Sequence, residues 1–310
     1  MKEPIGVPAP GGRLNVGFIG LGDMGGAIAE RIVEKGFPLT VCDLRAAAVA
    51  QLTARGASSA ANPSALAKGC DIVFVCVVDD RQVIALVQDH LARHLREDSV
   101  LVILSSVRPE TMHEIRALLA RDAHGNAAVS LLDSPVSGSR PAVAAGTLTL
   151  MIGGDATAIA RIRPVLEAFS AHIFPTGPLG SGQAMKIANN LMLHMNHLVA
   201  LEAVRFARAQ GISEKALMEV VNTSSGRSWV TETWGLIDDM FRDHPQAGTA
   251  GIYDMMVKEM WNAVLLSRST GTWLPLTGLG VQIGQAFHTE RERDLGIVHG
   301  GQLLESVPPR

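Results

Sequence analysis

The stretch from Leu14 to about Lys35 constrains the fold more than any other part of the chain. A short apolar strand, Leu14–Ile19, runs directly into a G-x-G-x-x-G turn, and a helical pattern follows. The first glycine allows a tight turn, the second lets backbone approach a pyrophosphate, and the third lets helix pack on strand. The residues expected to contact a dinucleotide here are Gly20, Leu21, Gly22, Asp23, Met24 and Gly25. The other interpretation is a tight turn in an α/β domain without a cofactor.

An acid after the second strand bears on which dinucleotide would bind. The strand Pro38–Cys42 ends in Asp43, about 20 residues after the turn. A carboxylate there can hold both ribose hydroxyls of NAD and repels the 2′-phosphate of NADP. Arg45 complicates this prediction, because a nearby guanidinium could receive that phosphate. The pattern favours NAD and leaves NADP open.

Further β–α units follow, which predicts an open parallel sheet. Asp71–Val78 has the apolar character of a strand buried on both faces, and Val100–Leu104 is another strand. Ligands of such sheets bind at the carboxyl ends of the strands. The candidates to line the dinucleotide are therefore Val77, Val78, Ser105 and Ser106, although each could be an ordinary strand end.

The segment Leu131–Ser139 reads as a strand end followed by a Ser/Gly turn. Such a turn can present backbone N–H groups and a hydroxyl to an anion. The pattern then predicts a strand over Gly146–Gly154, a helix over Ala156–Phe169 broken locally by Pro164, and a short strand at Ile173–Phe174.

A long helix is predicted from Gly182 to about Gln210. Residues three and four apart share a helix face, so its start carries a polar stripe of Gln183, Lys186, Asn189 and Asn190. The stripe alone fits a polar helix start with a solvated lysine equally well. The rest of the helix is apolar around much of its circumference, so it should be buried. One small domain can hardly cover it, which predicts a homo-oligomer.

The remainder of the chain reads as helical. Gly211 fits a helix stop and Ser213 the cap of the next helix. Helices are predicted over Ser228–Asp239, over Tyr253–Arg268, and from Pro275 to about Thr289, after a loop at Asn222–Arg227. Arg227, Trp229 and Trp234 are candidates for a ligand pocket, although packing and surface charge explain them at least as well.

Composition excludes several classes of protein. The chain has 310 residues, of which 47% are hydrophobic and 18% charged, as in globular proteins. A net charge of −3 argues against nucleic acid or an anionic membrane as partner. The three cysteines show no metal-binding spacing, and we predict no metal site. No apolar run approaches the roughly 20 residues that span a bilayer. Residues 1–12 lack the apolar core of a signal peptide, so we expect a loose tail and a cytoplasmic protein.

Taken together, the motifs resemble the β-hydroxyacid dehydrogenases, which include 3-hydroxyisobutyrate dehydrogenase and tartronate semialdehyde reductase. The matching pieces are Gly17–Gly25, Asp133–Gly138, Gly182–Asn190 and, more weakly, Lys258-Glu259. The resemblance implies a Rossmann-type α/β domain over 13–180 and an all-α substrate and oligomerisation domain over 181–303, joined by the long helix. Residues 1–12 and 304–310 would be tails, and the assembly a homodimer or homotetramer.

The resemblance also implies roles for individual residues. Lys186 corresponds to the family's catalytic acid/base, and Asn190 to the residue that orients the substrate. Ser137-Gly138 corresponds to the turn that binds the substrate carboxylate, and Lys258 to a lysine near the cofactor. Ser139, Asn189 and Trp229 complete the predicted substrate contacts.

The chain departs from the family pattern at four positions. Ser139 replaces a glycine and could narrow or polarise the anion pocket, and Val78 replaces a proline at a strand end. Glu259 replaces an aspartate, and Gly251 stands where an aromatic residue is usual. These differences make Lys258 the least secure correspondence.

The predicted reaction is the reversible, NAD(P)-dependent oxidation of a small 3-hydroxy acid to its semialdehyde or 3-oxo acid. Lys186 can serve as base and acid only if its pKa falls towards neutrality. A decarboxylating 6-phosphogluconate dehydrogenase would be longer and carry Lys-x-x-His-Asn, whereas this chain has Lys186-Ile-Ala-Asn-Asn190. Imine reductases typically lack the lysine. A catalytically silent dinucleotide sensor is the alternative from another class. The substituent of the substrate is left open.

Overall fold

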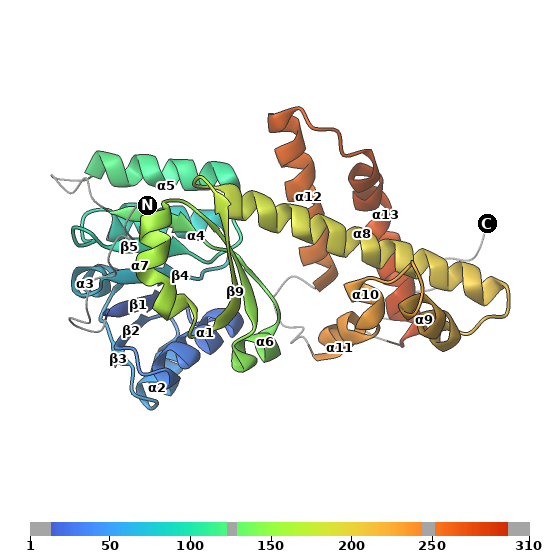
Figure 1. Cartoon of the computed structure of the whole chain (residues 1–310), viewed down its shortest axis with the longest axis horizontal. Helices are drawn as coiled ribbons and strands as arrows, with labels where there is room; N and C mark the ends of the chain where they lie inside the picture. Colours follow the sequence, from blue (N-terminus) through green and yellow to red (C-terminus); the bar gives the residue numbers. More distant parts are fainter. Residues whose placement is uncertain (1–13, 123–128, 244–251, 297–310) are drawn as a thin grey trace, which may run out of the picture. The chain divides into compact units, whose positions relative to one another are not determined.

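A computed structural model describes residues 14–122, 129–243 and 252–296 (Figure 1). The chain divides into two compact units, Met1–Lys186 and Ile187–Arg310. The division falls inside one long helix, so that helix contributes residues to both units. The predicted tails at 1–12 and 304–310 and the position of Gly251 lie outside the described residues.

The first unit is built on one sheet with the strand order β3-β2-β1-β4-β5-β6-β8-β7, with β9 paired to β8. Strands β1 to β6 run parallel, β8 is antiparallel to β6 and β7, and β9 is parallel to β8. The first strand lies inside the sheet and the chain winds out from it in both directions, as in Rossmann-type folds. The strands are β1 Val16–Ile19, β2 Leu39–Cys42, β3 Ser58–Ser59, β4 Ile72–Val75, β5 Val100–Ile103, β6 Ser130–Asp133, β7 Val136–Ser137, β8 Leu148–Gly153 and β9 Ser170–Gly177.

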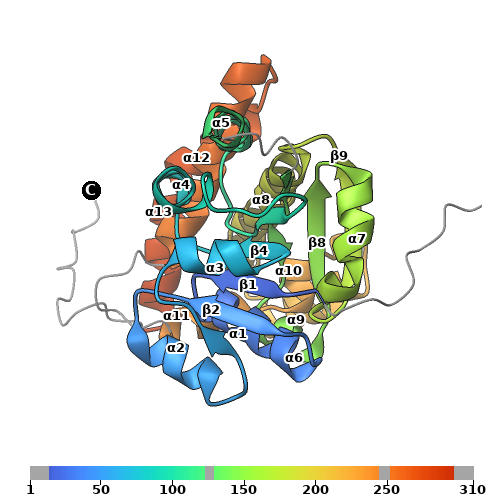
Figure 2. The same cartoon turned by 90° about the vertical axis from the view of Figure 1, so that its left-hand side faces the viewer.

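Helices cover both faces of this sheet. They are α1 Asp23–Glu34, α2 Ala46–Thr53, α3 Pro63–Gly69, α4 Asp80–Leu86, a π-helical turn Val87–Leu91, α5 Pro109–Asp122, α6 Arg140–Ala145 and α7 Ala156–Leu166. Figure 2 shows α1 and α2 on one side of β1 and β2, and α3 on the other. Successive strand residues point to opposite faces. Phe18 and Phe74 accordingly belong to one apolar core, and Ile19 and Val75 to a second.

Two predicted strand boundaries and one predicted helix break in this unit are wrong. Strand β4 ends at Val75, so Val77 and Val78 lie in the loop beyond it. Pro164 does not break α7, because it sits near the end of a helix whose apolar face is buried, and the single lost hydrogen bond is tolerated there. Strand β9 is longer than the predicted Ile173–Phe174, because it pairs with β8 along much of its length.

The long helix α8, Ser181–Ala209, confirms the prediction closely, and its 29 residues span about 43 Å. The second unit continues with α9 Glu214–Asn222, α10 Trp229–Glu232, α11 Leu236–Asp243, α12 Ile252–Thr270 and α13 Pro275–Asp294. The Ser213 hydroxyl accepts from the Ala216 N–H, so the predicted cap is confirmed. The single helix predicted over Ser228–Asp239 is wrong, because Gly235, at a φ of 93°, separates α10 from α11.

One face of α8 is exposed within the single chain, and its burial in an oligomer stays a prediction. Met192, Val199 and Phe206 are 65%, 59% and 71% exposed, and they recur every seven residues. A small apolar core lies elsewhere in this unit, around Leu198 and Met260. Within the described residues, no helix has both the length and the apolar character needed to cross a bilayer.

Candidate dinucleotide site and catalytic helix

The glycine-rich turn after β1 has the geometry that a dinucleotide needs. Gly20 has a φ of 91°, and a Cβ there would lie 2.3 Å from the Cys76 carbonyl oxygen. A Cβ on Gly25 would lie 2.1 Å from the Gly20 carbonyl oxygen. Gly22 is different, since nothing lies within 4 Å of its missing side chain. Two glycines therefore allow close packing, and the third leaves open space where a ligand can approach.

The predicted lining residues meet at the same edge of the sheet. The Ser105 hydroxyl accepts from the Val77 N–H and donates to the Val77 carbonyl, both at 2.8 Å. This pair of bonds ties the loop after β4 to the loop after β5. Val78 and Ser106 are exposed on these loops. Ser105 therefore acts through the backbone, while Val78 and Ser106 remain accessible.

Asp43 is held beside the turn by three donors. Its carboxylate accepts from the Leu21 N–H at 2.6 Å, from the Arg45 N–H at 2.8 Å and from Arg45 Nε at 3.1 Å. Burial raises the pKa of Asp43, but these hydrogen bonds and the Arg45 charge outweigh it, so the pKa is lowered overall. The acid that favours NAD and the arginine that would favour NADP are thus partners in one ion pair.

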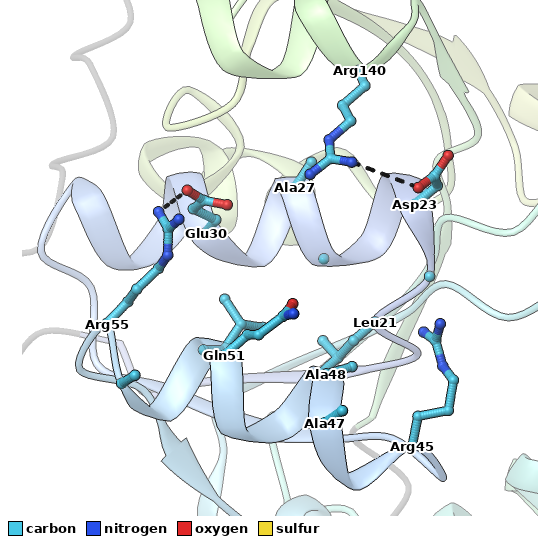
Figure 3. A pocket seen from close by; sticks show the side chains of 14 residues that line it. Leu21, Asp23, Ala27, Glu30, Arg45, Ala47, Ala48, Gln51, Arg55 and Arg140 are labelled. Carbon is cyan, nitrogen blue, oxygen red and sulfur yellow. Dashed lines mark hydrogen bonds and ion pairs between the residues drawn. The ribbon is translucent and has the colours of Figure 1, made fainter. Parts of the chain in front are cut away.

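A hollow of about 700 Å³ lies beside the turn, between α1 and α2 (Figure 3). Near the turn, Arg140 of α6 reaches over α1 to Asp23, with 3.7 Å between Nη1 and Oδ1. Arg45 rises from the start of α2 at the same end. Glu30 and Arg55 form an ion pair farther along α1. The volume is in the range of known cofactor and ligand sites.

The predicted anion turn joins β7 to α6. Ser137 pairs with Thr149 of β8 and is half-buried, whereas Gly138 and Ser139 are exposed. Gly138 has a φ of 127°, and a Cβ there would lie 2.7 Å from a Leu148 methyl group. This conformation favours glycine. The turn therefore has backbone and hydroxyl groups available, as an anion site requires.

The start of α8 is fixed to the sheet by Asp133, at the end of β6. The carboxylate of this fully buried residue accepts from the Gly180 N–H at 2.6 Å and from the Gln183 N–H at 2.8 Å. Burial raises the pKa of Asp133, and the backbone hydrogen bonds only partly offset the rise. A Cβ on Gly182 would lie 2.2 Å from the Met151 carbonyl oxygen, so the helix packs against β8 without a side chain between them.

Gln183, the first residue of the predicted polar stripe, makes its side-chain hydrogen bonds inside the first unit. Its side chain is buried, accepts from the Val107 N–H at 3.0 Å and donates to the Ser105 carbonyl at 2.9 Å. It therefore connects α8 to the loop after β5. Together with Asp133 it fixes the first turn of the helix in position and rotation.

The rest of the stripe follows on the same helix. Lys186 lies one turn after Gln183 and is half-buried. Asn190 lies one further turn on and is buried, and the Asn189 amide donates to its side-chain oxygen at 3.1 Å. An amine and an amide oxygen on successive turns of one helix can act on the same polar group.

Asp133 and Arg140 matter for this geometry, and each has a signal in the sequence beyond the predicted site residues. Asp133 is an acid at the end of a buried strand, which needs donors to balance its charge. Arg140 precedes Pro141 directly after the anion turn, and proline is common at the start of a helix. That placement puts the arginine at a helix amino terminus beside the predicted cofactor turn.

The candidates in the second unit divide into exposed and structural residues. Trp229 is exposed at the start of α10, and Lys258 is exposed on α12. Trp234 donates its indole N–H to Glu214 at 2.6 Å, which supports a packing role. Arg227 forms an exposed ion pair with Glu232. In the part of the chain that the structure describes, no three His, Cys, Asp or Glu side chains form a group that could hold a metal ion.

Family models match both parts of the chain. Residues 15–177 match the NAD binding domain of 6-phosphogluconate dehydrogenase, and residues 180–299 match the NAD-binding domain of NADP-dependent 3-hydroxyisobutyrate dehydrogenase. The chain is 31% identical over 290 residues to the NAD-dependent L-serine dehydrogenase of Pseudomonas aeruginosa, covering 91% of this chain and 96% of that one. It is 29% identical over 299 residues to the 2-(hydroxymethyl)glutarate dehydrogenase of Eubacterium barkeri, covering 95% and 97%.

Solved structures agree with these relatives. The 3-hydroxyisobutyrate dehydrogenase of Mycobacterium tuberculosis, described with L-serine, has a TM-score of 0.78 and 25% identity, covering 90% of this chain and 94% of that one. An imine reductase from Streptomyces aurantiacus shares the fold, with a TM-score of 0.62 and 22% identity over 91% and 95% of the two chains. The chain therefore belongs to the β-hydroxyacid dehydrogenase family of NAD(P)-dependent oxidoreductases.

Proposed function

We propose that the protein interconverts a small 3-hydroxy acid and its semialdehyde, with Lys186 as general acid/base. The three substrates named for the relatives are L-serine, 2-(hydroxymethyl)glutarate and 3-hydroxyisobutyrate. Each has a hydroxymethyl group and a carboxylate on the same carbon, and they differ in the third substituent. We propose this shared skeleton as the substrate class.

The nicotinamide of the bound cofactor supplies the hydride acceptor or donor. Lys186 takes the proton of the hydroxyl group as the alcohol is oxidised, and returns it to the alkoxide in the reverse direction. The Asn190 amide, one turn along α8, holds the reacting oxygen without adding charge. Asn189 supports it through the hydrogen bond to Asn190.

The observation that carries this proposal is the rigid start of α8. Asp133 binds two N–H groups of the first turn, and the buried Gln183 amide bonds in both directions to the loop after β5. Lys186 is the next residue on that face. A base that acts on a bound alcohol must be held in place before the reaction, and these buried bonds do so.

The anion turn is proposed to bind the carboxylate of the substrate. The Ser137 hydroxyl and the N–H groups of the turn around Gly138 suit a carboxylate, because a left-handed turn aims successive N–H groups at one point. Ser139 adds a second hydroxyl where the family usually has glycine. We propose that it tightens the site around a small acid. Trp229 and Lys258 keep their predicted roles as substrate and cofactor contacts.

A homo-oligomer is proposed from the exposed apolar face of α8. Met192, Val199 and Phe206 lie at heptad spacing, the pattern by which one helix packs against another. Three side chains of this size in one row exceed what scattered exposure on a monomer explains. A homodimer or homotetramer in which a second copy covers this row is consistent with that pattern. A cytoplasmic location also remains a proposal, since some relatives are described as mitochondrial.

The test is an absorbance assay of NADH and NADPH formation over a panel of acids with the shared skeleton. We expect turnover with at least one member. Lys186→Ala should lower kcat by about 10³-fold, within the usual range for loss of an acid/base, while NADH binding is retained. Lys68→Ala, an exposed lysine of α3, is the matched control and should keep full activity. Near-normal turnover of Lys186→Ala would refute the assignment.

The alternatives give different results in the same experiment. An imine reductase would reduce cyclic imines with NADPH and would leave the acids unchanged. A dinucleotide sensor would bind NADH and turn over neither set of compounds. Lys186 favours the dehydrogenase over both alternatives, because neither needs an amine at that position.

A further inference from the structure

We propose that the Asp23–Arg140 ion pair determines how well the site distinguishes NAD from NADP, together with the Asp43–Arg45 pair. The Asp23 charge would partly offset the attraction of Arg140 for a 2′-phosphate, so that the site favours the dinucleotide without that group. The inference rests on the dinucleotide site of the proposed function and not on the identity of the hydroxy acid.

The two pairs lie at the same end of the hollow. Asp23 follows Gly22 in the glycine-rich turn, and its side chain is 91% exposed. Arg140, itself 67% exposed, reaches it from α6 at 3.7 Å. Arg45 lines this end from the start of α2 and binds Asp43. Figure 3 shows Arg140 above the first turn of α1 and Arg45 below it.

This arrangement is balanced in charge. Each carboxylate beside the turn has one guanidinium as its partner, so neither sign is in excess. A 2′-phosphate would add between one and two negative charges near two carboxylates. The hydroxyl groups of an unphosphorylated ribose add no charge and can donate to a carboxylate instead. The balanced pairs therefore favour NAD, and removing one carboxylate would release an arginine.

A released Arg140 is suited to a phosphate group. The guanidinium is planar, permanently charged and able to donate two parallel hydrogen bonds to phosphate oxygens. Its ion pair with Asp23 is exposed and therefore weak. Little free energy opposes a change of partner. Asp23 is thus the residue whose charge decides what Arg140 can bind.

The test measures binding of NADH and NADPH by isothermal titration calorimetry to the full chain and to three variants. Asp23→Asn should raise the affinity for NADPH three- to tenfold relative to the affinity for NADH. Arg140→Ala should lower affinity for NADPH by a similar factor, since the Asp23 charge is then unopposed. The double variant should have a ratio of NADPH to NADH affinity close to that of the wild-type protein. The differences should shrink between about 0.05 and 0.5 M salt, because exposed charges are screened.

A matched control is the Arg163–Glu167 pair at the end of α7, an exposed pair at 3.6 Å in the same unit that does not line the hollow. Glu167→Gln should leave both affinities unchanged. Equal changes for NADH and NADPH in Asp23→Asn and Arg140→Ala would mean that the pair acts on the shared pyrophosphate, which would overturn the proposal. An unchanged ratio would also overturn it. A wild-type protein that binds NADH but oxidises no acid would contradict the proposed function alone.

Discussion

The two units of the chain bury their apolar side chains to different extents. The first has a core on each face of its sheet, and among the described residues its large exposed apolar side chains are Leu44, Val78, Phe174 and Met185. Among its described residues, the second has a small core and fourteen such side chains, including three of its four tryptophans. The first unit completes its own core, whereas the second leaves apolar surface that a partner could cover.

Buried charge differs between the units as well. In the first, the buried Asp133 carboxylate is neutralised by backbone N–H groups. In the second, the buried Arg291 donates to both Glu214 and Asp238. The same unit buries His194, His197 and His288, and the rings of His197 and His288 are stacked. The interior of the first unit therefore depends on backbone geometry. The stability of the second unit therefore depends on the protonation state of its buried side chains.

The largest predicted effect is acid sensitivity of the second unit. Burial, then the charges of neighbouring groups, lowers the pKa of His197 to about 4 and that of His288 to about 3. The unfolded chain binds a proton at each of these histidines near pH 6.5, whereas the folded chain does so only at lower pH. The free energy of unfolding is therefore highest above pH 6.5 and falls as the pH drops below it. From pH 6.5 to 4.5 we expect a loss of about 2 kcal/mol for each histidine.

The pH range of the loss distinguishes the effect of the histidines from that of the acidic side chains. Burial opposes the shift of Glu214, but its bonds to Arg291 and Trp234 and the arginine charges lower its pKa to about 2, so its contribution is lost only below about pH 4.5. All four tryptophans lie beyond residue 186, so urea unfolding followed by tryptophan fluorescence reports on the second unit. His288→Gln should reduce by about half the slope of the free energy of unfolding against pH between pH 6.5 and 4.5. A slope that His288→Gln leaves unchanged would contradict this account.

The next effect concerns the exposed row on α8. Replacing Val199 and Phe206 together by Asp should weaken self-association by at least about 100-fold, because two charges would enter an apolar contact. Analytical ultracentrifugation measures the change. Lys215→Asp, at an exposed position on α9, is a control for added negative charge. An unchanged sedimentation profile in the double variant would place the subunit contact elsewhere.

The sequence predicted those parts of the fold and of the candidate site that depend on neighbouring residues. The roles of Gly20, Gly22 and Gly25 follow from their spacing, and the cap at Ser213 from one residue type before a helix. Contacts between distant residues could not be predicted in this way. Gln183 bonds to residues 76 and 78 positions earlier, and nothing near it in the sequence indicates those partners. Arg140 likewise meets a residue more than 100 positions away.

An effect of intermediate size is expected in the first unit when Asp133 is replaced. Asp133→Asn keeps one acceptor but turns an amide N–H₂ towards a backbone N–H of the α8 turn, which we expect to cost about 2 kcal/mol. Hydrogen exchange at Gly180–Gln183 should speed up, and kcat should fall more than KM rises, since Lys186 loses its support. Tryptophan fluorescence of the second unit should show an unchanged urea midpoint. Equal loss in both units would mean that they unfold together.

The smallest effect is expected at the far end of the hollow. Glu30 lies two turns along α1 from Asp23, and its ion pair with Arg55 is partly exposed. Glu30→Gln should change stability by less than about 0.5 kcal/mol, as is usual for such pairs, and should leave the ratio of NADH to NADPH affinity unchanged. Calorimetric binding and thermal unfolding measure both quantities. A shift in the ratio as large as that of Asp23→Asn would show that the whole hollow senses the ribose phosphate. Discrimination would then belong to the summed charge of the hollow and not to the turn.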